Sequence, residues 1–254
     1  MFDTSEEFRT LFSLKEPAQQ VDIDWCEKPI KLPDVMQQNV DQYWRTLDKA
    51  HIFNGTLVRL DHWQCLQDHP KLFLRPSDYK TLLYSNRYTR AICDTWGPVH
   101  LSRILGISAV LISEDEKLIY MKRSPFVGEY PGHLDVFGGH IDVQKEKEPP
   151  DVYRAMAQEL EEEVNLQPEE YSLTLLGLIE VNDNLKPELI FQARARLSCK
   201  EICERTLNSK DRKEFSQVLC IDNFYSAIEK VLLRDRKLFS PSAFGCLCLY
   251  INRF

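Results

Sequence analysis

Four glutamates fall within positions 159–163, in the stretch "AQELEEEVNL" of residues 157–166, with no lysine or arginine among them. Glutamates at this density either form a solvated helix face or surround a cation. Glu159 and Glu163 are four positions apart, so on a helix they are neighbours whose repulsion costs a few tenths of a kcal/mol. A divalent cation removes that cost, and hard carboxylate oxygens suit Mg²⁺ or Mn²⁺. We therefore expect Glu159 and Glu163 to bind a metal ion.

The residues around these glutamates have a helical pattern from 151 to 165. An apolar stripe repeats at Val152, Met156, Leu160 and Val164. At about 100° per residue, Glu163 falls within the buried arc, Glu159 at its edge and Glu162 somewhat beyond, whereas Glu161 points to solvent. Because partly buried, unpaired charges are costly, this placement favours the metal site over the solvated face.

The segments before and after this helix contain residues that are typical of turns. Gly138 and Gly139, in "DVFGGHID", allow a sharp turn or a close approach to a ligand. A loop with the sequence "QKEKEPP" (residues 144–150) then leads into the helix. Asn165 stands where the helix must end, and asparagine is the usual alternative to glycine in the left-handed position that follows a helix. We predict a left-handed conformation for Asn165.

The whole chain limits the classes of partner. It has 254 residues, a net charge of −7, 43% hydrophobic and 28% charged residues, which is typical of an ordinary globular protein of one or two domains. The negative net charge gives no indication of the basic surface that binds duplex nucleic acid. No apolar run reaches the roughly 18 residues of a membrane span, and the acidic start "MFDTSEEFRT" lacks the pattern of a signal peptide. We expect a cytoplasmic protein that binds neither nucleic acid nor membrane; the oligomeric state stays open.

The eight cysteines are scattered. Cys199 and Cys203 are four positions apart and Cys246 and Cys248 two apart, without a CxxC pair and without histidines at the spacing of zinc ligands. The sequence therefore predicts reduced thiols.

The residue composition and the pattern of predicted elements change near residue 100. Before it lie short pieces rich in Pro, Gln and Asp, with one amphipathic helix predicted over residues 34–50. After it come strand-like runs at 107–113, 117–123, 173–181, 188–197 and 215–221, and a helix over 240–254 that opens with Ser240 and Pro241. This alternation predicts an α/β domain over residues 101–254, with residues 1–100 as an extension packed on it.

The acidic helix resembles part of a known signature. The Nudix hydrolases carry a box written G-x5-E-x7-R-E-U-x-E-E-x-G-U, in which U is a bulky aliphatic residue, and residues 158–166 match its second half. Gln158 replaces the arginine and Asn165 the glycine, and the interval from Gly139 is too long, so the first glutamate of the box has no counterpart. These departures resemble one branch of the family, the animal uridine diphosphate glucose pyrophosphatases, which hydrolyse UDP-sugars.

The resemblance to this branch extends beyond the box. It includes "KRSPFVGEYPGHLDVFGGH" before the box, "LLGLIEVNDN" after it and "PSAFGCLCLYINR" near the C-terminus, with weaker matches at "IFNGTLVRL" and "DYKTLLYSN". It thus covers most of residues 40–254. It implies a Nudix α/β/α sandwich around a mixed sheet, with an N-terminal α+β extension that helps to build the nucleotide pocket. It also implies Mg²⁺-dependent hydrolysis of UDP-glucose or UDP-galactose to UMP and the sugar 1-phosphate.

Residue by residue, the resemblance implies catalytic and metal-binding roles for Glu159 and Glu163, with Glu162 as a supporting carboxylate. It implies substrate contacts at Phe53, Tyr79, Arg123, Gly128, Asp135, His140, Asp142 and Ser242. Asp142 and Gly128 replace a glutamate and an alanine of the branch, which leaves the contacts to the sugar open.

Each substrate residue also has an ordinary structural interpretation. Arg123 is either a charge at the end of a strand or a bidentate ligand for a diphosphate. His140 is either a turn histidine or a donor to a phosphate or a sugar hydroxyl. Ser242 near a helix start either belongs to the helix end or to a phosphate site. Phe53 and Tyr79 are either core aromatics or stacking partners for a uracil ring.

Three questions stay open at the level of sequence. The attacking water is activated either by the metal or by a carboxylate, for which Glu162 and Glu188 are candidates. The lost arginine at position 158 leaves a nucleotide-binding module without turnover as an alternative. A Nudix enzyme for another nucleoside diphosphate compound, coenzyme A or an RNA cap is the second alternative, because an aromatic side chain stacks on any flat base.

Overall fold

A mixed sheet forms the centre of the computed structural model, which describes residues 6–48, 52–143 and 148–254. Within this part of the chain, eight strands belong to the sheet: β1 (Phe8–Ala18), β5 (Gly106–Ile112), β6 (Lys117–Arg123), β7 (Leu134–Asp135), β8 (Phe137–His140), β9 (Tyr171–Val181), β10 (Pro187–Ala195) and β11 (Phe215–Asp222). Their order is β1-β9-β10-β5-β6-β11, with β7 paired to β6 and β8 to β5. β10 and β5 run parallel, whereas the other pairs are antiparallel.

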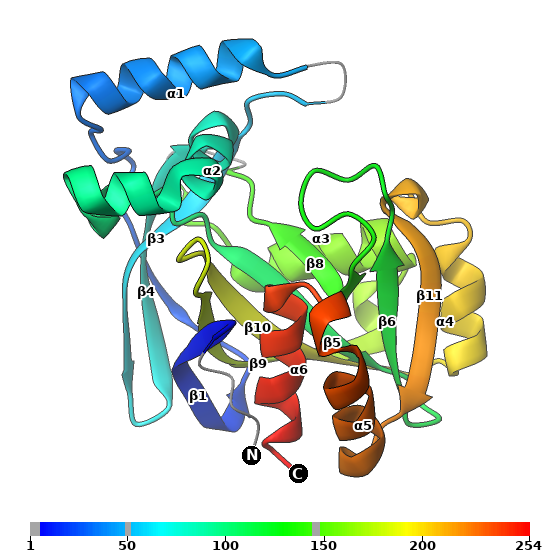
Figure 1. The fold of residues 1–254 in the computed structure, drawn as a ribbon. Coiled ribbons are helices and arrows are strands. Elements are labelled where there is room, and N and C mark those ends of the chain that lie inside the picture. Colours follow the sequence, from blue (N-terminus) through cyan, green and yellow to red (C-terminus); the bar gives the residue numbers. More distant parts are fainter. Residues whose placement is uncertain (1–5, 49–51, 144–147) are drawn as a thin grey trace.

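Helices cover both faces of this sheet (Figure 1). One face carries α3 (Val152–Val164) and α4 (Cys199–Thr206), and the other carries α5 (Tyr225–Asp235) and α6 (Pro241–Ile251). The central strand β5 shows why. Ile107 and Leu111 face the core beneath α3, and Val110 and Ile112 face the core beneath α6, as the two-residue period of a strand requires. The predicted α/β/α sandwich with a mixed sheet is confirmed.

The first hundred residues add a second, smaller sheet and two helices. β2 (Asp22–Trp25), β4 (His69–Asp78) and β3 (Thr56–Leu66) form the sheet in that order. α1 (Asp34–Thr46) and α2 (Tyr79–Trp96) pack on each other through Met36, Val40, Tyr84 and Ile92. This α+β arrangement is the one that the family resemblance implies, although the sequence pattern itself predicted only the helix α1.

Backbone hydrogen bonds join the extension to the rest of the chain. The N–H of Val58 on β3 donates to the carbonyl of Ile141 at 2.8 Å, and the N–H of Leu105 donates to the carbonyl of Val58 at 2.8 Å. Leu72 and Leu74 of β4 also share one core with α3, and β1 pairs with β9 in the large sheet. The division at residue 100 stays a prediction, and these contacts hold the two parts together as one packed unit.

The predicted elements after residue 100 are confirmed. The five strand-like runs form β5, β6, β9, β10 and β11, and the C-terminal helix is α6. The N-terminal helix starts at Asp34 as predicted but ends at Thr46, while the predicted end at residue 50 lies outside the described residues, as do residues 144–147 of the predicted loop. The strands of the extension were not predicted. In β1 the alternation of apolar residues is broken by a register shift between Thr10 and Phe12, which hides the period of two.

In the described part of the chain, no helix combines the length and the apolar character needed to cross a membrane.

The acidic helix α3 begins and ends as the sequence predicts. Asp151 caps its start by accepting hydrogen bonds from the N–H groups of Tyr153 and Arg154, both at 3.0 Å. Asn165 follows its last turn in the left-handed conformation, with φ 60° and ψ 41°, and its N–H donates to the carbonyl of Glu161 at 2.9 Å. This cap ends the helix directly after Glu163 and Val164, so it fixes where the Glu163 carboxylate lies.

Substitutions at Asn165 test this cap. Asn165→Gly should leave stability and activity near wild type, because glycine has no Cβ penalty in the left-handed region. Asn165→Val should lower the free energy of unfolding by on the order of 1–2 kcal/mol and weaken Mg²⁺ binding by moving the end of α3. Thermal melts and Mg²⁺ titrations of the three proteins measure both effects. If the valine and glycine variants behave alike in both assays, the cap does not position Glu163.

Candidate active site

The two predicted metal ligands lie where α3 passes the glycine pair of β8. The Glu163 side chain points inward and is only 2% exposed, and its Oε2 accepts the N–H of Gly138 at 2.8 Å. Glu159, one turn earlier, lies against Gly139. The structure thus brings both carboxylates together at one end of a central strand.

The glycines are required for this approach. Gly138 has a φ of 156°, and a Cβ there would lie 2.0 Å from the carbonyl oxygen of Ile107. A Cβ at Gly139 would lie 2.4 Å from Oε1 of Glu159. A side chain at Gly138 would displace β8 from β5, and one at Gly139 would displace Glu159. The glycines thus allow close approach of neighbouring protein groups, and the close approach of a ligand stays a prediction.

The electrostatics of this pair favour the binding of a cation. Burial, followed by repulsion from Glu162 and Glu214, raises the pKa of Glu159 to about 8. Burial and the neighbouring Glu159 raise the pKa of Glu163 well above its usual range, although the hydrogen bond from Gly138 opposes the shift. Neither side chain has an ion pair within the described residues. A buried and a partly buried carboxylate without a counter-charge are costly unless they are protonated or bind a cation.

The donor set fits a hard divalent cation. Across the described residues, carboxylate oxygens do not meet in groups of three within 4.8 Å, so a closed cage of protein ligands is absent there. Mg²⁺ commonly binds through one or two carboxylates and takes its other ligands from water and substrate phosphates. Glu159 and Glu163 provide such a pair at the wall of a cavity.

The cavity in front of this pair has a volume of about 570 Å³ and an acidic lining. Eight carboxylates line it against three cationic side chains: Glu129, Asp135, Asp142, Glu159, Glu162, Glu188, Asp211 and Glu214 against Arg123, Lys186 and Lys210. Glu163 lies just behind the wall, at Gly138. A phosphorylated ligand would be repelled by this excess of negative charge unless divalent cations entered with it.

Glu162 differs from the other two predicted catalytic glutamates because it has a counter-charge. Lys210 Nζ lies 2.5 Å from its Oε1, and Gln158 Nε2 donates to the same oxygen at 3.1 Å. Burial alone would raise the pKa of Glu162, but these two hydrogen bonds outweigh it and lower the pKa. Glu162 is therefore a poor proton acceptor, and its supporting role is that of a stable anion near the pair.

Arg123 at the end of β6 is held by Asp135. Nη1 of Arg123 lies 3.1 Å from Oδ2 of Asp135, and its Nε donates to the carbonyl of Glu129 at 3.0 Å. The other oxygen of Asp135 accepts a hydrogen bond from Ser240 Oγ at 2.9 Å. Both residues line the cavity as predicted, but the Asp135 oxygens are engaged within the protein. Asp135 is therefore better placed to orient Arg123 than to contact the substrate directly.

His140 is a neutral ring at the cavity wall. Its Nε2 is buried without a hydrogen-bond partner and lies 3.5 Å from Oε2 of Glu129. Burial, followed by repulsion from Lys186, lowers the pKa of His140 to about 3. The 3.5 Å approach is therefore not an ion pair at neutral pH. An unpartnered ring nitrogen facing the cavity is free to bond with a ligand.

Lys186 was missed by sequence reasoning. Its Nζ is buried 3.7 Å from Oε2 of both Glu129 and Glu188, and Glu188 also accepts a hydrogen bond from Ser108 Oγ at 2.6 Å. The available signal was the pair Lys186 and Glu188, two positions apart at the start of a strand and so on one face. Lys210, Asp211 and Glu214, also in the lining, come from the segment between α4 and β11 and gave no signal in the sequence.

The remaining predicted substrate residues lie at the mouth of the cavity or beside it. Phe53 lines the mouth and is 79% exposed. Tyr79, the first residue of α2, is half-buried in the lining, and a Cβ at Gly128 would lie 3.5 Å from its hydroxyl. Gly128 itself is not part of the lining. Asp142 and Ser242, in the first turn of α6, both line the cavity.

Comparison with known proteins connects this site to a family. A protein of Arabidopsis thaliana named Nudix hydrolase 9 is 30% identical over 142 residues, which is 48% of this chain and 45% of the relative. The chain thus spans less than half of that relative. The Mus musculus protein named uridine diphosphate glucose pyrophosphatase NUDT22 is 25% identical over 241 residues, 82% of this chain and 77% of the relative. The chain is a relative of the Nudix hydrolases.

The other comparisons add nothing to this relationship. No family model matches the chain. Among solved structures, the Nudix domain of Shewanella oneidensis NrtR, complexed with ADP ribose, has a TM-score of 0.43 and 14% identity, and the match covers 64% of this chain and 96% of that one. This structural likeness is weak, so the relationship to the Nudix hydrolases stands on the two sequence relatives. The expected resemblance to this family is confirmed.

The departures from the Nudix box now have a structural account. Gln158 is exposed on α3 and hydrogen-bonds to Glu162, and the positive charge beside Glu162 comes from Lys210 instead. Asn165 takes the left-handed position in which the box has glycine. With both changes present, α3 is helical through Glu159 and Glu163.

The raised pKa of Glu159 predicts the pH dependence of stability without metal. Between its usual value of 4.5 and about 8, this carboxyl holds its proton in the folded state and loses it in the unfolded state. In the metal-free protein, the contribution of Glu159 to the free energy of unfolding should therefore be complete below this window and should be lost as the pH rises through it. Near pH 8 the Tm of metal-free Glu159→Gln should exceed that of wild type by at least about 2–4 °C, and the difference should shrink toward pH 4.5.

Thermal melts in a chelator across this pH range check the expectation, with Glu161→Gln as the control because Glu161 is exposed on the same helix. A wild type that is as stable as Glu159→Gln at the alkaline end would show that the buried charge carries no penalty.

Proposed function

We propose that this Nudix relative is a divalent-cation-dependent hydrolase that splits the diphosphate of UDP-glucose or UDP-galactose into UMP and the sugar 1-phosphate. The observation that carries the proposal is the pair of the partly buried Glu159 and the buried Glu163, which lie without counter-charge against Gly139 and Gly138 at the wall of an acidic cavity. Such a pair is costly by itself and becomes favourable with a cation and an anionic ligand.

The reaction needs little covalent chemistry from the protein. Hydrolysis of a diphosphate adds water across one phosphorus–oxygen bond, and its barrier is lowered mainly by charge neutralisation and alignment. Glu159 and Glu163 would hold the cation, preferably Mg²⁺, with Mn²⁺ as an alternative. When bound, the cation would neutralise phosphate charge and lower the pKa of water at the site.

Arg123 would grip a phosphate on the opposite side. Its guanidinium is fixed by Asp135 and by the carbonyl of Glu129, and a pre-oriented arginine suits a phosphate better than a flexible one. The neutral His140 would accept or donate one hydrogen bond to the sugar or to a phosphate. Lys186 lies farther back and stabilises Glu129 and Glu188.

The choice of general base is narrowed by the ion pairs. Glu162 is neutralised by Lys210, and Glu188 is engaged by Ser108 and Lys186. The hydrogen bonds to Glu162 lower its pKa and weaken it as a proton acceptor. Burial raises the pKa of Glu188, so Glu188 stays a candidate base beside activation of the water by the cation.

The uridine part of the proposal comes from the extension and from one relative. Tyr79 and Phe53 give the cavity two aromatic rings on the side of the extension, and a nucleobase stacks well on such rings. The mouse relative, which matches 82% of this chain, is named for action on uridine diphosphate glucose. We infer the same substrate class for this chain.

A screen of nucleoside diphosphate compounds with Mg²⁺, read by product chromatography, tests the proposal. We expect UDP-glucose or UDP-galactose to yield UMP and the sugar 1-phosphate, with no turnover in a chelator. Glu159→Gln and Glu163→Gln should reduce kcat at least a thousandfold, on the order of the loss of one major electrostatic group, whereas Glu161→Gln should retain it. Turnover of another compound alone would correct the substrate, and binding without turnover would favour the non-catalytic module.

The stacking role of Tyr79 has its own test. A stacked base contributes about 1–3 kcal/mol, so Tyr79→Ala should raise KM for the uridine substrate by roughly 5- to 150-fold. The Tm should fall little, because the substitution removes free energy of substrate binding rather than of folding. Tyr225→Ala on α5, outside the cavity lining, is the control. A large fall in Tm with an unchanged KM would show that Tyr79 serves only the core.

A further inference from the structure

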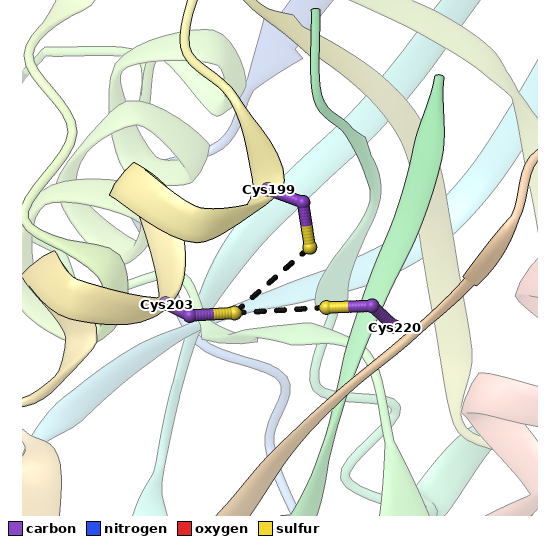
Figure 2. A group of neighbouring side chains, drawn as sticks. All are labelled: Cys199, Cys203 and Cys220. Atoms are coloured by element: carbon purple, nitrogen blue, oxygen red, sulfur yellow. Dashed lines mark hydrogen bonds between the residues drawn. The ribbon is translucent and has the colours of Figure 1, made fainter. Parts of the chain in front are cut away.

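Three cysteine sulfurs meet outside the cavity, between α4 and β11 (Figure 2). Cys199 and Cys203 come from α4, and Cys220 comes from β11. Sγ of Cys203 lies 4.0 Å from Sγ of Cys199 and 3.6 Å from Sγ of Cys220, and all three sulfurs lie within 4.8 Å of one another. In the sequence, Cys199 and Cys203 had no partner at a metal-ligand spacing; the fold brings in Cys220.

The spacing of these sulfurs matches the face of a tetrahedral metal site. With a Zn–S bond of about 2.3 Å, two thiolates of a tetrahedral centre lie about 3.8 Å apart. The measured separations of 4.0 Å and 3.6 Å bracket that value. Cys199 and Cys203 are four positions apart on one side of a helix, which keeps both sulfurs on the side that faces β11.

The chemistry and access of this cluster differ from those of the acidic pair. Thiolates are soft ligands that select Zn²⁺ or Cu⁺, whereas carboxylates select Mg²⁺ or Mn²⁺. Cys220 is exposed, and the other two are partly exposed, so an ion can enter from solvent. A zinc ion with three protein ligands keeps its fourth position for water.

We propose that Cys199, Cys203 and Cys220 bind one Zn²⁺ ion through three thiolates, with the fourth position open to solvent. The ion would tie α4 to β11, the two elements that the segment 207–214 connects. This segment places Lys210, Asp211 and Glu214 in the cavity lining, and the Asp211 N–H donates to the Glu162 carbonyl at 2.9 Å. The site is therefore a structural clip that positions one wall of the cavity. The proposal does not depend on the identity of the substrate.

Cobalt is the probe that separates this site from the carboxylates. Co²⁺ is titrated into the reduced, metal-free full chain in excess Mg²⁺, which keeps the carboxylate pair filled. We expect a thiolate-to-cobalt charge-transfer band in the near ultraviolet that saturates at one equivalent, because carboxylates give no such band. Zn²⁺ should then abolish the band and raise the Tm, since an ion that binds only the folded state stabilises it.

Single serine variants locate the ligands. Cys203→Ser and the exposed Cys220→Ser should each lose the charge-transfer band and the Tm shift with Zn²⁺. Cys26→Ser is the matched control, because Cys26 is partly exposed and lies in the extension, where its thiol donates to the carbonyl of Lys28; this variant should keep both the band and the Tm shift. The absence of a band in wild type, its survival in both cluster variants, or a disulfide within the cluster in protein purified without reductant would overturn the proposal.

Discussion

The structure of the site depends on the burial of Glu163 beside Glu159. An inward carboxylate on the buried stripe of α3 has to find a donor, and the N–H of Gly138 is that donor. This one hydrogen bond requires β8 to bring its backbone against the helix, which only glycine allows at positions 138 and 139. One residue beyond Glu163, α3 ends at Val164, and the left-handed Asn165 turns the chain away from the helix. The helix cap, the glycine pair and the position of both glutamates are therefore one linked arrangement.

The cationic side chains that line the cavity pair with other carboxylates and not with Glu159 or Glu163. Lys210 neutralises Glu162, Lys186 lies between Glu129 and Glu188, and Arg123 is held by Asp135. Glu159 and Glu163 are left to an ion from solution. Because the ion pairs already exist without a ligand, the cavity needs little reorganisation when a cation and a phosphorylated compound enter, which is the condition for effective electrostatic stabilisation.

The local parts of this site could be predicted from the sequence, and the long-range parts could not. The helical period placed Glu163 inward and Glu161 outward, and Asn165 was expected in the left-handed region; both are confirmed. Glu129, Lys186 and Lys210 were missed because each is a single charged residue in an irregular or strand-edge segment. Their burial follows only from tertiary packing. The strands of the extension were missed because bulges interrupt their alternation, and the cysteine cluster because its third member lies on another element.

The central claim, that Glu159 and Glu163 form a divalent-cation site, is tested most directly by Mn²⁺ binding. Electron paramagnetic resonance titrations measure free Mn²⁺ in wild type, Glu163→Gln and the exposed control Glu161→Gln, without substrate. Since removing one of two carboxylate ligands from a buried site costs at least about 1.4 kcal/mol, or tenfold in affinity, Glu163→Gln should bind at least tenfold more weakly, and Glu161→Gln should match wild type. Equal Mn²⁺ affinity in wild type and Glu163→Gln would contradict the assignment.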